Sequence, residues 1–459
     1  NMNQRSRLSL LVTQIFFASL MLALFGRLFY LQVAAGPIYR DAALSIQSRD
    51  VVTPANRGFI VDSSGVPLAL NKVGLAITVD RTKIDKLPDK GEAVIRDLVG
   101  LLGLNYADVW QRTRLCGELP TGQKAGCWTG SRFQPIPITK EADPQLALRI
   151  VERSDRYPGV TASPVAIRSY PENLGLSGGH VLGYVGPLTE EDLSGANGRT
   201  YFRSESIGKA GLESMYDSYL RGVPGIKTFI VDRKEAVTTT RKNTQPIAGA
   251  HLVTSLDMRL QAASEKALAD AVKRARGLGF PADGGAAIVM DSTTGEIYAM
   301  STIRKNADGT YTADSGNFAA VDAYEPGSVA KVFSVSAALN EATVETNSVF
   351  QVPGKQVFNE GTKWVHSITD AYPHGLEEMT VRKILVDSSN LGTVQIAQTM
   401  PAETLHKYLK EYGFGTKTDV DYPGESKGLL KSFNELRGTE KITTAYGYGY
   451  SSSALQLIA

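Results

Sequence analysis

A serine and a lysine that could act together lie in the segment Glu325-Pro-Gly-Ser328-Val-Ala-Lys331. Pro326 and Gly327 indicate a turn, and the apolar run after Lys331 predicts a buried helix. Ser328 would then lie at a helix N-terminus, where free N–H groups stabilise developing negative charge. Lys331 would lie one turn further along the same face. Because a buried amine with a lowered pKa can take a serine proton, we interpret Ser328 as a nucleophile and Lys331 as its base.

A second candidate segment is Ser388-Ser389-Asn390. It follows one amphipathic stretch, Met379–Val386, and precedes another, Leu391–Gln398. These patterns predict a short connection between two helices, where side chains can face a cleft. We therefore expect Ser388 and Asn390 to share a site with Ser328. Neither spacing is specific by itself, because similar ones occur at Ser206–Lys209, Ser315–Asn317 and Ser432–Asn434.

The sequence lacks the common patterns for metal, phosphate or cofactor binding. Its five histidines (180, 251, 366, 374 and 406) show no metal-ligand spacing, and it contains no phosphate-binding loop of the G-x-x-x-x-G-K-[ST] type. We expect no metal and no cofactor. The net charge is only +2, which argues against a nucleic-acid-binding protein. With 42% hydrophobic and 21% charged residues, the composition is that of an ordinary globular protein and excludes bulk disorder.

One apolar stretch lies near the N-terminus. Leu8–Gly26 carries no charge, and with Leu28–Val33 beyond a single arginine it is long enough to cross a bilayer core of roughly 30 Å. We predict a transmembrane signal anchor over residues 8–33 behind a tail of residues 1–7. A buried helix and a cleaved signal peptide are the alternatives. Two arginines before the span balance two after it, so charge alone leaves the orientation open.

The remaining chain has the length for further domains, since 459 residues allow about three in all. A strand, a long helix and a hairpin predict an α/β domain that begins near residue 246. The elements predicted from local patterns are strands at Phe59–Val61, Val181–Val185 and Leu252–Leu256, helices at Ala142–Glu152, Ala210–Leu220 and Arg259–Arg276, and a hairpin of Gly285–Asp291 with Gly295–Met300.

Cys116 and Cys127 are the only cysteines, and they lie in a polar, glycine-rich stretch. Two cysteines are too few for a zinc site made of cysteines alone. In an oxidising compartment they would close a small loop, and in a reducing one they would be free thiols. The residues alone leave both states open.

Taken in order, the motifs resemble those of a class B penicillin-binding protein, a monofunctional peptidoglycan D,D-transpeptidase. The S-x-x-K motif at Ser328 precedes the S-x-N motif at Ser388. Glu325-Pro-Gly, Ser-Ser-Asn and Gly413-Phe-Gly415 resemble the cell-division branch more than the elongation branch. The other matching segments are Arg27–Val33, Arg57–Asp62, Arg168–Pro171, His180–Gly183, Gly211–Glu213, Gly222–Gly225, Asp232–Arg233, Leu256–Asp257, Leu260–Gln261, Pro423–Glu425, Gly447–Gly449 and Leu455–Gln456.

The resemblance implies three parts: a single N-terminal transmembrane helix, a mixed α+β elongated pedestal over residues 34–245, and an α/β transpeptidase domain of the serine β-lactamase type over residues 246–459. It places the short tail in the cytoplasm and the bulk outside the cytoplasmic membrane. That location favours a disulfide between Cys116 and Cys127. The implied partners are peptidoglycan stem peptides, β-lactams, a polytopic SEDS-type glycan polymerase and division-complex membrane proteins, with no nucleic acid.

The resemblance also implies a role for each site residue. Ser328 would attack the penultimate D-Ala carbonyl of a stem peptide, with Lys331 as general base. Ser388 would relay a proton to the leaving amine. Asn390 would hold the acyl chain and help to position Lys331.

The third motif of the family, K-[ST]-G, does not occur in the sequence, because Asp419 follows Lys417-Thr418 and Phe433 follows Lys431-Ser432. In the family it comes after the stretch matched here by Gly447–Gln456. We therefore expect a truncated transpeptidase domain in this chain, with little or no penicillin labelling, and an active parent. The alternative functions are a non-catalytic partner that recruits a glycan polymerase, an elongation-branch transpeptidase and a β-lactam sensor.

Overall fold

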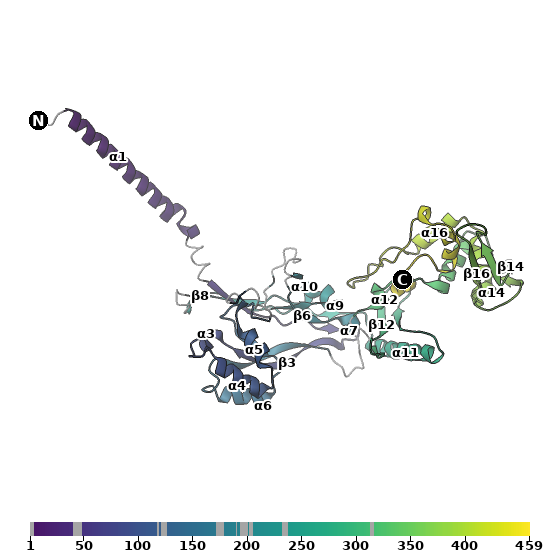
Figure 1. Cartoon of the computed structure of the whole chain (residues 1–459), viewed down its shortest axis with the longest axis horizontal. Coiled ribbons are helices and arrows are strands. Elements are labelled where there is room, and N and C mark those ends of the chain that lie inside the picture. Colours follow the sequence, from purple (N-terminus) through teal and green to yellow (C-terminus); the bar gives the residue numbers. More distant parts are fainter. Residues whose placement is uncertain are drawn as a thin grey trace.

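The computed structural model describes residues 4–39, 48–116, 119–120, 126–170, 179–189, 191–192, 201, 205–231, 237–312 and 316–459. Three parts follow one another along its long axis (Figure 1): a lone helix, a β-rich middle part and an α/β part at the far end. The described range leaves out the start of the predicted tail and, at least in part, two segments that match the family: residue 171 and residues 232–233 are among the omitted ones.

The lone helix is α1 (Gln4–Phe29), which continues as a π-helix over Tyr30–Ala34. Residues Leu11–Ala34 form one helix that is long and apolar enough to cross a membrane, with a mean hydropathy of 1.8. None of this window is buried against the rest of the protein. The apolar N-terminal helix expected from the sequence is therefore confirmed, and its apolar surface is open to a bilayer.

The middle part contains two main sheets. The sheet nearer α1 has the order β1 (Ser48–Thr53), β8 (Gly225–Val231), β9 (Val237–Thr244), all antiparallel. The second sheet contains β10 (Leu252–Val253), β2 (Ile60–Val61), β3 (Pro67–Val79) and β4 (Ile136–Thr139), and β5 (Val160–Ser169) also pairs with β3. The strands β6 (Val185–Pro187) and β7 (Ser206–Gly208) pair only with each other and form a separate two-stranded sheet.

Helices cover one side of the second sheet (Figure 1). Helix α3 (Arg81–Ile84) precedes α4 (Glu92–Leu102), α5 (Tyr106–Thr113) and α6 (Pro144–Glu152), and their apolar faces share a core with β3 that includes Ile77, Ile95 and Ile150. Helix α6 ends at the predicted residue but begins two residues later than predicted, because Asp143 caps the N–H groups of the first turn and Pro144 follows it.

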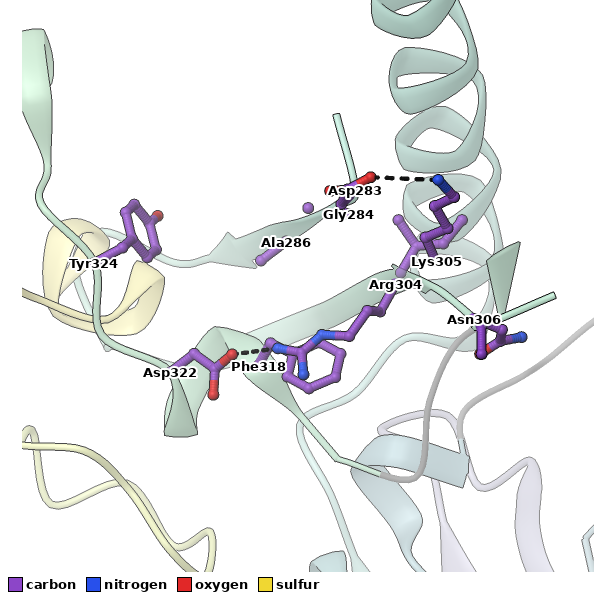
Figure 2. Close-up of a pocket in the computed structure, with 12 residues that line it drawn as sticks. Asp283, Gly284, Ala286, Arg304, Lys305, Asn306, Phe318, Asp322 and Tyr324 are labelled. Carbon is purple, nitrogen blue, oxygen red and sulfur yellow. Dashed lines mark hydrogen bonds and ion pairs between the residues drawn. The ribbon is translucent and has the colours of Figure 1, made fainter. Parts of the chain in front are cut away.

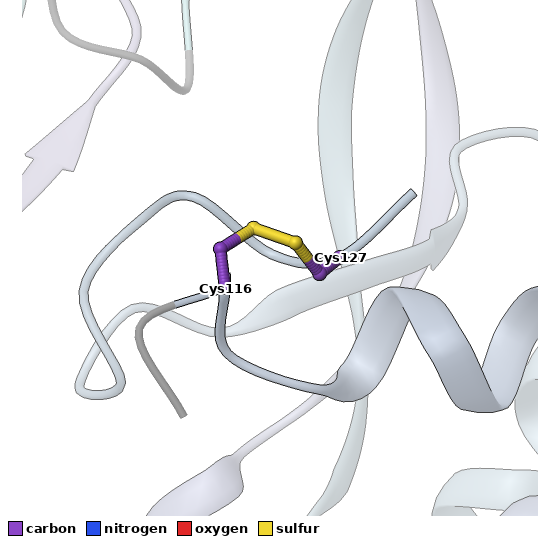
Figure 3. The surroundings of a disulfide bond; sticks show 2 residues. All are labelled: Cys116 and Cys127. Atoms are coloured by element: carbon purple, nitrogen blue, oxygen red, sulfur yellow. A yellow bond between two sulfur atoms is a disulfide. The ribbon is translucent and has the colours of Figure 1, made fainter. Parts of the chain in front are cut away.

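Beyond α5, a disulfide joins Cys116 to Cys127 (Figure 3). Two backbone hydrogen bonds flank it, from Cys116 N to the Trp128 carbonyl at 3.0 Å and from Trp128 N to the Arg114 carbonyl at 2.7 Å. The bridge therefore closes a short loop soon after α5, and both cysteines are bonded.

One predicted strand is wrong. Val181–Val185 was expected to be extended, but Gly179–Leu182 is helix α7 and β6 starts only at Val185. A short apolar run fits a buried helix as well as a buried strand. Gly183 decides the outcome: its φ is +76°, and a Cβ there would lie 1.7 Å from the Ala210 carbonyl oxygen. This left-handed residue ends the helical turn.

Helix and strand predictions nearer the C-terminus hold with adjusted bounds. Ala210–Leu220 forms two short helices, α9 (Gly211–Met215) and α10 (Asp217–Leu220). Of Leu252–Leu256, only β10 is a strand, and it pairs in parallel with β2 of the middle part. The domain boundary near residue 246 stays a prediction, because this strand, expected to open the second domain, lies in the sheet of the first.

The α/β part begins with α11 (Met258–Gly277), which packs on the sheet of β11 (Gly284–Met290), β12 (Ile297–Lys305) and β13 (Tyr311–Thr312). The predicted long helix and hairpin are confirmed. A mostly helical lobe follows, with its own core. Its elements are α13 (Lys331–Asn340), α14 (Val381–Val386), α15 (Asn390–Ala397), α16 (Ala402–Glu411), α17 (Glu440–Thr443), and the strand pairs β14 (Val349–Val352) with β17 (Glu377–Thr380) and β15 (Lys355–Phe358) with β16 (His366–Thr369). Two short helices, α12 (Phe318–Val321) and α18 (Ala454–Ile458), lie instead against the sheet of β11, and their buried residues belong to a different core.

Candidate active site

Ser328 lies in a turn of 3₁₀-helix over Gly327–Ala330 that leads directly into α13. Distant residues hold this turn in place. Gly327 N donates to the Gly447 carbonyl at 3.1 Å, and Gly449 N donates to Glu325 Oε1 at 2.9 Å. A Cβ at Gly447 would lie 2.0 Å from the Gly327 carbonyl oxygen, so only glycine allows this approach. The nucleophile turn is therefore clamped from outside its own helix.

Lys331 is the first residue of α13, and its side chain points back to Ser328. The residue is only 2% exposed. Its Nζ lies 3.1 Å from Ser328 Oγ, 3.0 Å from Ser388 Oγ and 2.5 Å from the Ser388 carbonyl oxygen. The fold thus brings together Ser328, Lys331 and Ser388, as the sequence predicted.

Burial shifts the protonation of this amine. Removal from water lowers the pKa of Lys331 to about 8, although the nearby carboxylate of Asp370 opposes the shift. About one amine in ten is then neutral at pH 7, compared with fewer than one in a thousand at the ordinary lysine pKa. A neutral amine within hydrogen-bonding distance of two hydroxyls can accept a proton from either of them.

Ser388 lies between α14 and α15 with a φ of +54°, in the left-handed region. This conformation costs a non-glycine residue roughly 1–2 kcal/mol. It turns both the carbonyl and the hydroxyl of Ser388 toward Lys331. The next residue, Ser389, is the N-cap of α15 and accepts from Gly392 N at 2.8 Å. The strained turn is therefore held by a capped helix.

Asn390 is the first residue of α15. Its Nδ2 donates to the Thr369 carbonyl at the end of β16, at 2.9 Å. In the described part of the chain, the hydrogen-bond partners of the Lys331 amine are Ser328 and Ser388. Asn390 was expected to help position Lys331, but no hydrogen bond between the two side chains is among these contacts, and the amide nitrogen binds the neighbouring strand.

Two family models match the chain: the Penicillin-binding Protein dimerisation domain over residues 52–254 and the Penicillin binding protein transpeptidase domain over residues 285–459. Together they cover most of its length. The chain belongs to the class B penicillin-binding proteins. The resemblance found in the sequence and the fold class expected from it are confirmed.

Similar proteins support this membership. Peptidoglycan D,D-transpeptidase FtsI of Escherichia coli is 27% identical over 441 residues, which cover 95% of this chain and 66% of the relative. Peptidoglycan D,D-transpeptidase MrdA of Acinetobacter baumannii is 25% identical over 466 residues, 95% of this chain and 64% of the relative. The chain thus spans just under two thirds of the length of these curated relatives.

A solved structure shares the fold. In a complex between penicillin-binding protein PBP2 and MreC from Helicobacter pylori, the matching chain superposes with a TM-score of 0.65 at 23% identity. The match covers 89% of this chain and 75% of the other. At this identity the likeness concerns the architecture alone.

Sequence reasoning missed Asp370 in this penicillin-binding protein. Asp370 follows β16, and its carboxylate accepts from Ser389 Oγ at 2.6 Å and from Leu391 N at 3.0 Å. It thereby ties the Ser388–Asn390 turn to the neighbouring strand. No motif marks this aspartate, and its role depends on a contact with residues about twenty positions further along the chain.

The alternative motif spacings lie elsewhere. Lys209 follows strand β7 and forms an ion pair with Asp192, while Ser432 caps a short 3₁₀-helix. The Ser315 spacing falls outside the described residues. Within the described ranges, no group of three or more His, Cys, Asp or Glu side chains could hold a metal ion.

A cavity of about 820 Å³ lies along β11 (Figure 2). Arg304 extends over the ring of Phe318, 3.3 Å from its centroid, and pairs with Asp322 at the cavity wall. Tyr324 lines the same cavity. Neither Ser328 nor Lys331 contributes to its lining, so the assignment of the active site rests on the clustered side chains and not on this cavity.

Proposed function

We propose that this protein is a peptidoglycan D,D-transpeptidase that acts through a serine acyl-enzyme. The observation that carries the proposal is the buried Lys331 amine held between the hydroxyls of Ser328 and Ser388. This arrangement supplies a nucleophile, a base and a proton relay within hydrogen-bonding distance of one another. Membership of the family supports the choice of substrate, a stem peptide that ends in D-Ala-D-Ala.

In the proposed reaction, Ser328 Oγ attacks the carbonyl carbon of the penultimate D-Ala, and its proton passes to Lys331 Nζ. The Ser328 backbone N–H stabilises the oxyanion. Ser388 then relays a proton to the departing amine as the peptide bond breaks, which releases D-Ala and leaves an ester. The amine of a second stem attacks this ester, forms the crosslink and frees Ser328. A β-lactam enters the first step in place of the stem peptide.

Asn390 contributes to substrate binding in this scheme. Its Nδ2 is bound to the Thr369 carbonyl, which fixes the amide plane and leaves Oδ1 as an acceptor for an N–H of the acyl chain. Lys331 is positioned without Asn390, through Ser388 and the clamped turn around Ser328.

Labelling with a fluorescent penicillin tests the function, using the protein as its gene encodes it. We expect covalent labelling of the wild type and none of Ser328→Ala. A protein that never labels would refute the acyl-enzyme proposal, and a labelled Ser328→Ala variant would refute the choice of nucleophile.

We further propose that the protein serves septal cell-wall synthesis from the outer face of the cytoplasmic membrane. Helix α1 would be the single-pass anchor, with the short N-terminal tail in the cytoplasm, and a polytopic SEDS-type glycan polymerase with division-complex membrane proteins would be its partners. The division role rests on the Glu325-Pro-Gly, Ser-Ser-Asn and Gly-Phe-Gly segments, because relatives named FtsI and MrdA match at similar identity. A fluorescent fusion should concentrate at the septum, and an even distribution along the cell envelope would favour the elongation branch.

A further inference from the structure

His374 lies beside Asp370, in the segment between β16 and β17. Its Nε2 is 3.0 Å from Asp370 Oδ2, and its Nδ1 is 2.7 Å from the Gly375 carbonyl oxygen. Both ring nitrogens therefore face oxygen acceptors. A neutral imidazole carries only one N–H, so only the doubly protonated ring can donate to both. The geometry fits a positively charged His374.

Asp370 has two effects on the active site, and they conflict. Its carboxylate holds the Ser388–Asn390 turn through Ser389 Oγ and Leu391 N. Its side chain is only 5% exposed, so its negative charge is poorly screened by water. That charge favours the ammonium form of Lys331, which cannot act as a base. The Ser388–Asn390 turn therefore depends on the Asp370 carboxylate. The proposed proton transfer to Lys331, however, requires that the effect of this negative charge on the amine be reduced.

We propose that His374 is a positioning residue for the Lys331 amine: its positive charge offsets that of Asp370, so that the carboxylate can hold the turn without keeping Lys331 protonated. This inference rests on the proposed acylation of Ser328. It assigns His374 an electrostatic role that acts through Asp370 and needs no contact with the substrate.

The neighbouring charges are consistent with this role. Asp370 raises the pKa of His374, and it raises the pKa of Lys331 against the effect of burial. Glu377 Oε2 also faces the ring, 4.0 Å from Nδ1, but Lys383 Nζ lies 3.2 Å from the other oxygen of Glu377. Lys383 in turn pairs with Asp387. Asp370 is thus the charged group hydrogen-bonded to the ring, and the other acidic neighbours already have a cation.

The direct test measures the titration of Lys331 by trace acetylation at a series of pH values, followed by mass spectrometry of its peptide. Only the neutral amine reacts. We expect His374→Gln to move the midpoint upward from about 8, by roughly half a pH unit, which leaves about threefold less neutral amine at pH 7. His374→Arg keeps a positive charge and should titrate like the wild type. Asp370→Asn should move the midpoint in the opposite direction.

A matched control is His366→Gln, at an exposed histidine of β16 that should leave the Lys331 midpoint unchanged. Acylation by the fluorescent penicillin at pH 7 should fall about threefold in His374→Gln and recover at high pH. A His374→Gln midpoint that superimposes on the wild type would overturn the inference. Equal shifts in His374→Gln and His374→Arg would also overturn it, because they would show a structural effect and not a charge effect.

The titration separates this inference from the proposed function, because it can be repeated in Ser328→Ala. If no variant is labelled by penicillin but the Lys331 midpoint still depends on residue 374 as described, the acyl-enzyme proposal fails alone. If labelling occurs and the midpoint does not depend on residue 374, the inference fails alone.

Discussion

At the scale of single residues, the proposed chemistry depends on the charge of Lys331. The amine is buried, touches both site serines and has a pKa lowered to about 8 by its loss of hydration. A lysine at its ordinary pKa would be a poor base near neutrality, since almost none of it would be unprotonated. Burial within the fold lowers the pKa of Lys331. The negative charge of Asp370 opposes this effect, and the proposed role of His374 is to offset that charge.

Acylation should therefore depend on pH through this amine. Because the base is the unprotonated form, the rate constant for acylation by a fluorescent penicillin should rise about tenfold per pH unit below 8 and level off above it. Lys331→Met should lower the rate by about 10² or more at every pH. Lys209→Met, at the lysine of the other S-x-x-K spacing, should leave the profile unchanged. A profile that is flat between pH 6 and 9 would contradict the role of Lys331.

At the scale of elements, the site depends on the junction between β16 and the N-terminus of α15. Ser389 is both the cap of that helix and a donor to Asp370. Its contacts oppose the strain of the left-handed Ser388 next to it. Helix α14 has a comparable cap, where Thr380 Oγ1 accepts from Lys383 N at 3.1 Å, but that hydroxyl has no bond to Asp370 in the described contacts.

Substitutions at these two N-caps can distinguish an effect on stability from an effect on acylation. We expect Ser389→Ala and Thr380→Ala each to lower the free energy of unfolding by about 1 kcal/mol, as loss of an N-cap commonly does. Only Ser389→Ala should also slow penicillin acylation, because only it removes a hydrogen bond that ties the Ser388 turn to Asp370. Urea unfolding and labelling kinetics on the same samples provide the comparison. Equal slowing by both substitutions would show that acylation follows overall stability and not the turn.

At the scale of the whole molecule, a buried ionic cluster joins segments that are far apart in the chain. Glu213 is fully buried and accepts from Arg57 Nε and Arg168 Nε, each at 2.6 Å, while Asp217 accepts from Arg57 Nη1 at 2.8 Å. The cluster draws the connection after β1, the end of β5 and helices α9 and α10 together in the middle part (Figure 1).

Further contacts connect this middle part to the α/β part. His180 Nε2 lies 2.9 Å from the Met300 carbonyl oxygen in β12, and Tyr422 Oη donates to the His180 carbonyl at 2.6 Å. Tyr216 Oη also donates to Asp421. The two parts are thus joined by the buried hydrogen bonds of His180 and by the exposed one of Tyr216, as well as by the chain itself.

Removing the central carboxylate should destabilise the middle part strongly. Glu213→Ala leaves Arg168 buried without a counter-charge and leaves Arg57 with Asp217 alone, and we expect a loss of about 3–5 kcal/mol. Glu92→Ala removes only the exposed pair with Arg96 and should cost well under 1 kcal/mol. Unfolding in urea followed by circular dichroism would compare the two variants. Similar losses in both would mean that the buried cluster does not stabilise the fold.

The sequence by itself determined the features that depend on local periodicity and on motif spacing. The apolar helix α1, the hairpin of β11 and β12, and the approach of Lys331 to Ser328 all follow from residues less than about thirty positions apart. The order of the motifs was enough to identify the family. Local pattern was not enough at Val181–Leu182, because a short apolar run packs equally well as a helix or a strand.

Only the tertiary structure decided what surrounds the two motifs. Ser388 reaches Lys331 across 57 positions, and β10 pairs with β2 across nearly two hundred. Asp370 and His374 belong to no motif, and they matter because the end of β16 comes to rest against the N-terminus of α15. Burial and long-range contacts determine the protonation state of a group, and neither can be predicted from the spacing of nearby residues. The motifs therefore identify the residues proposed to react, while the packing around these residues determines their protonation states.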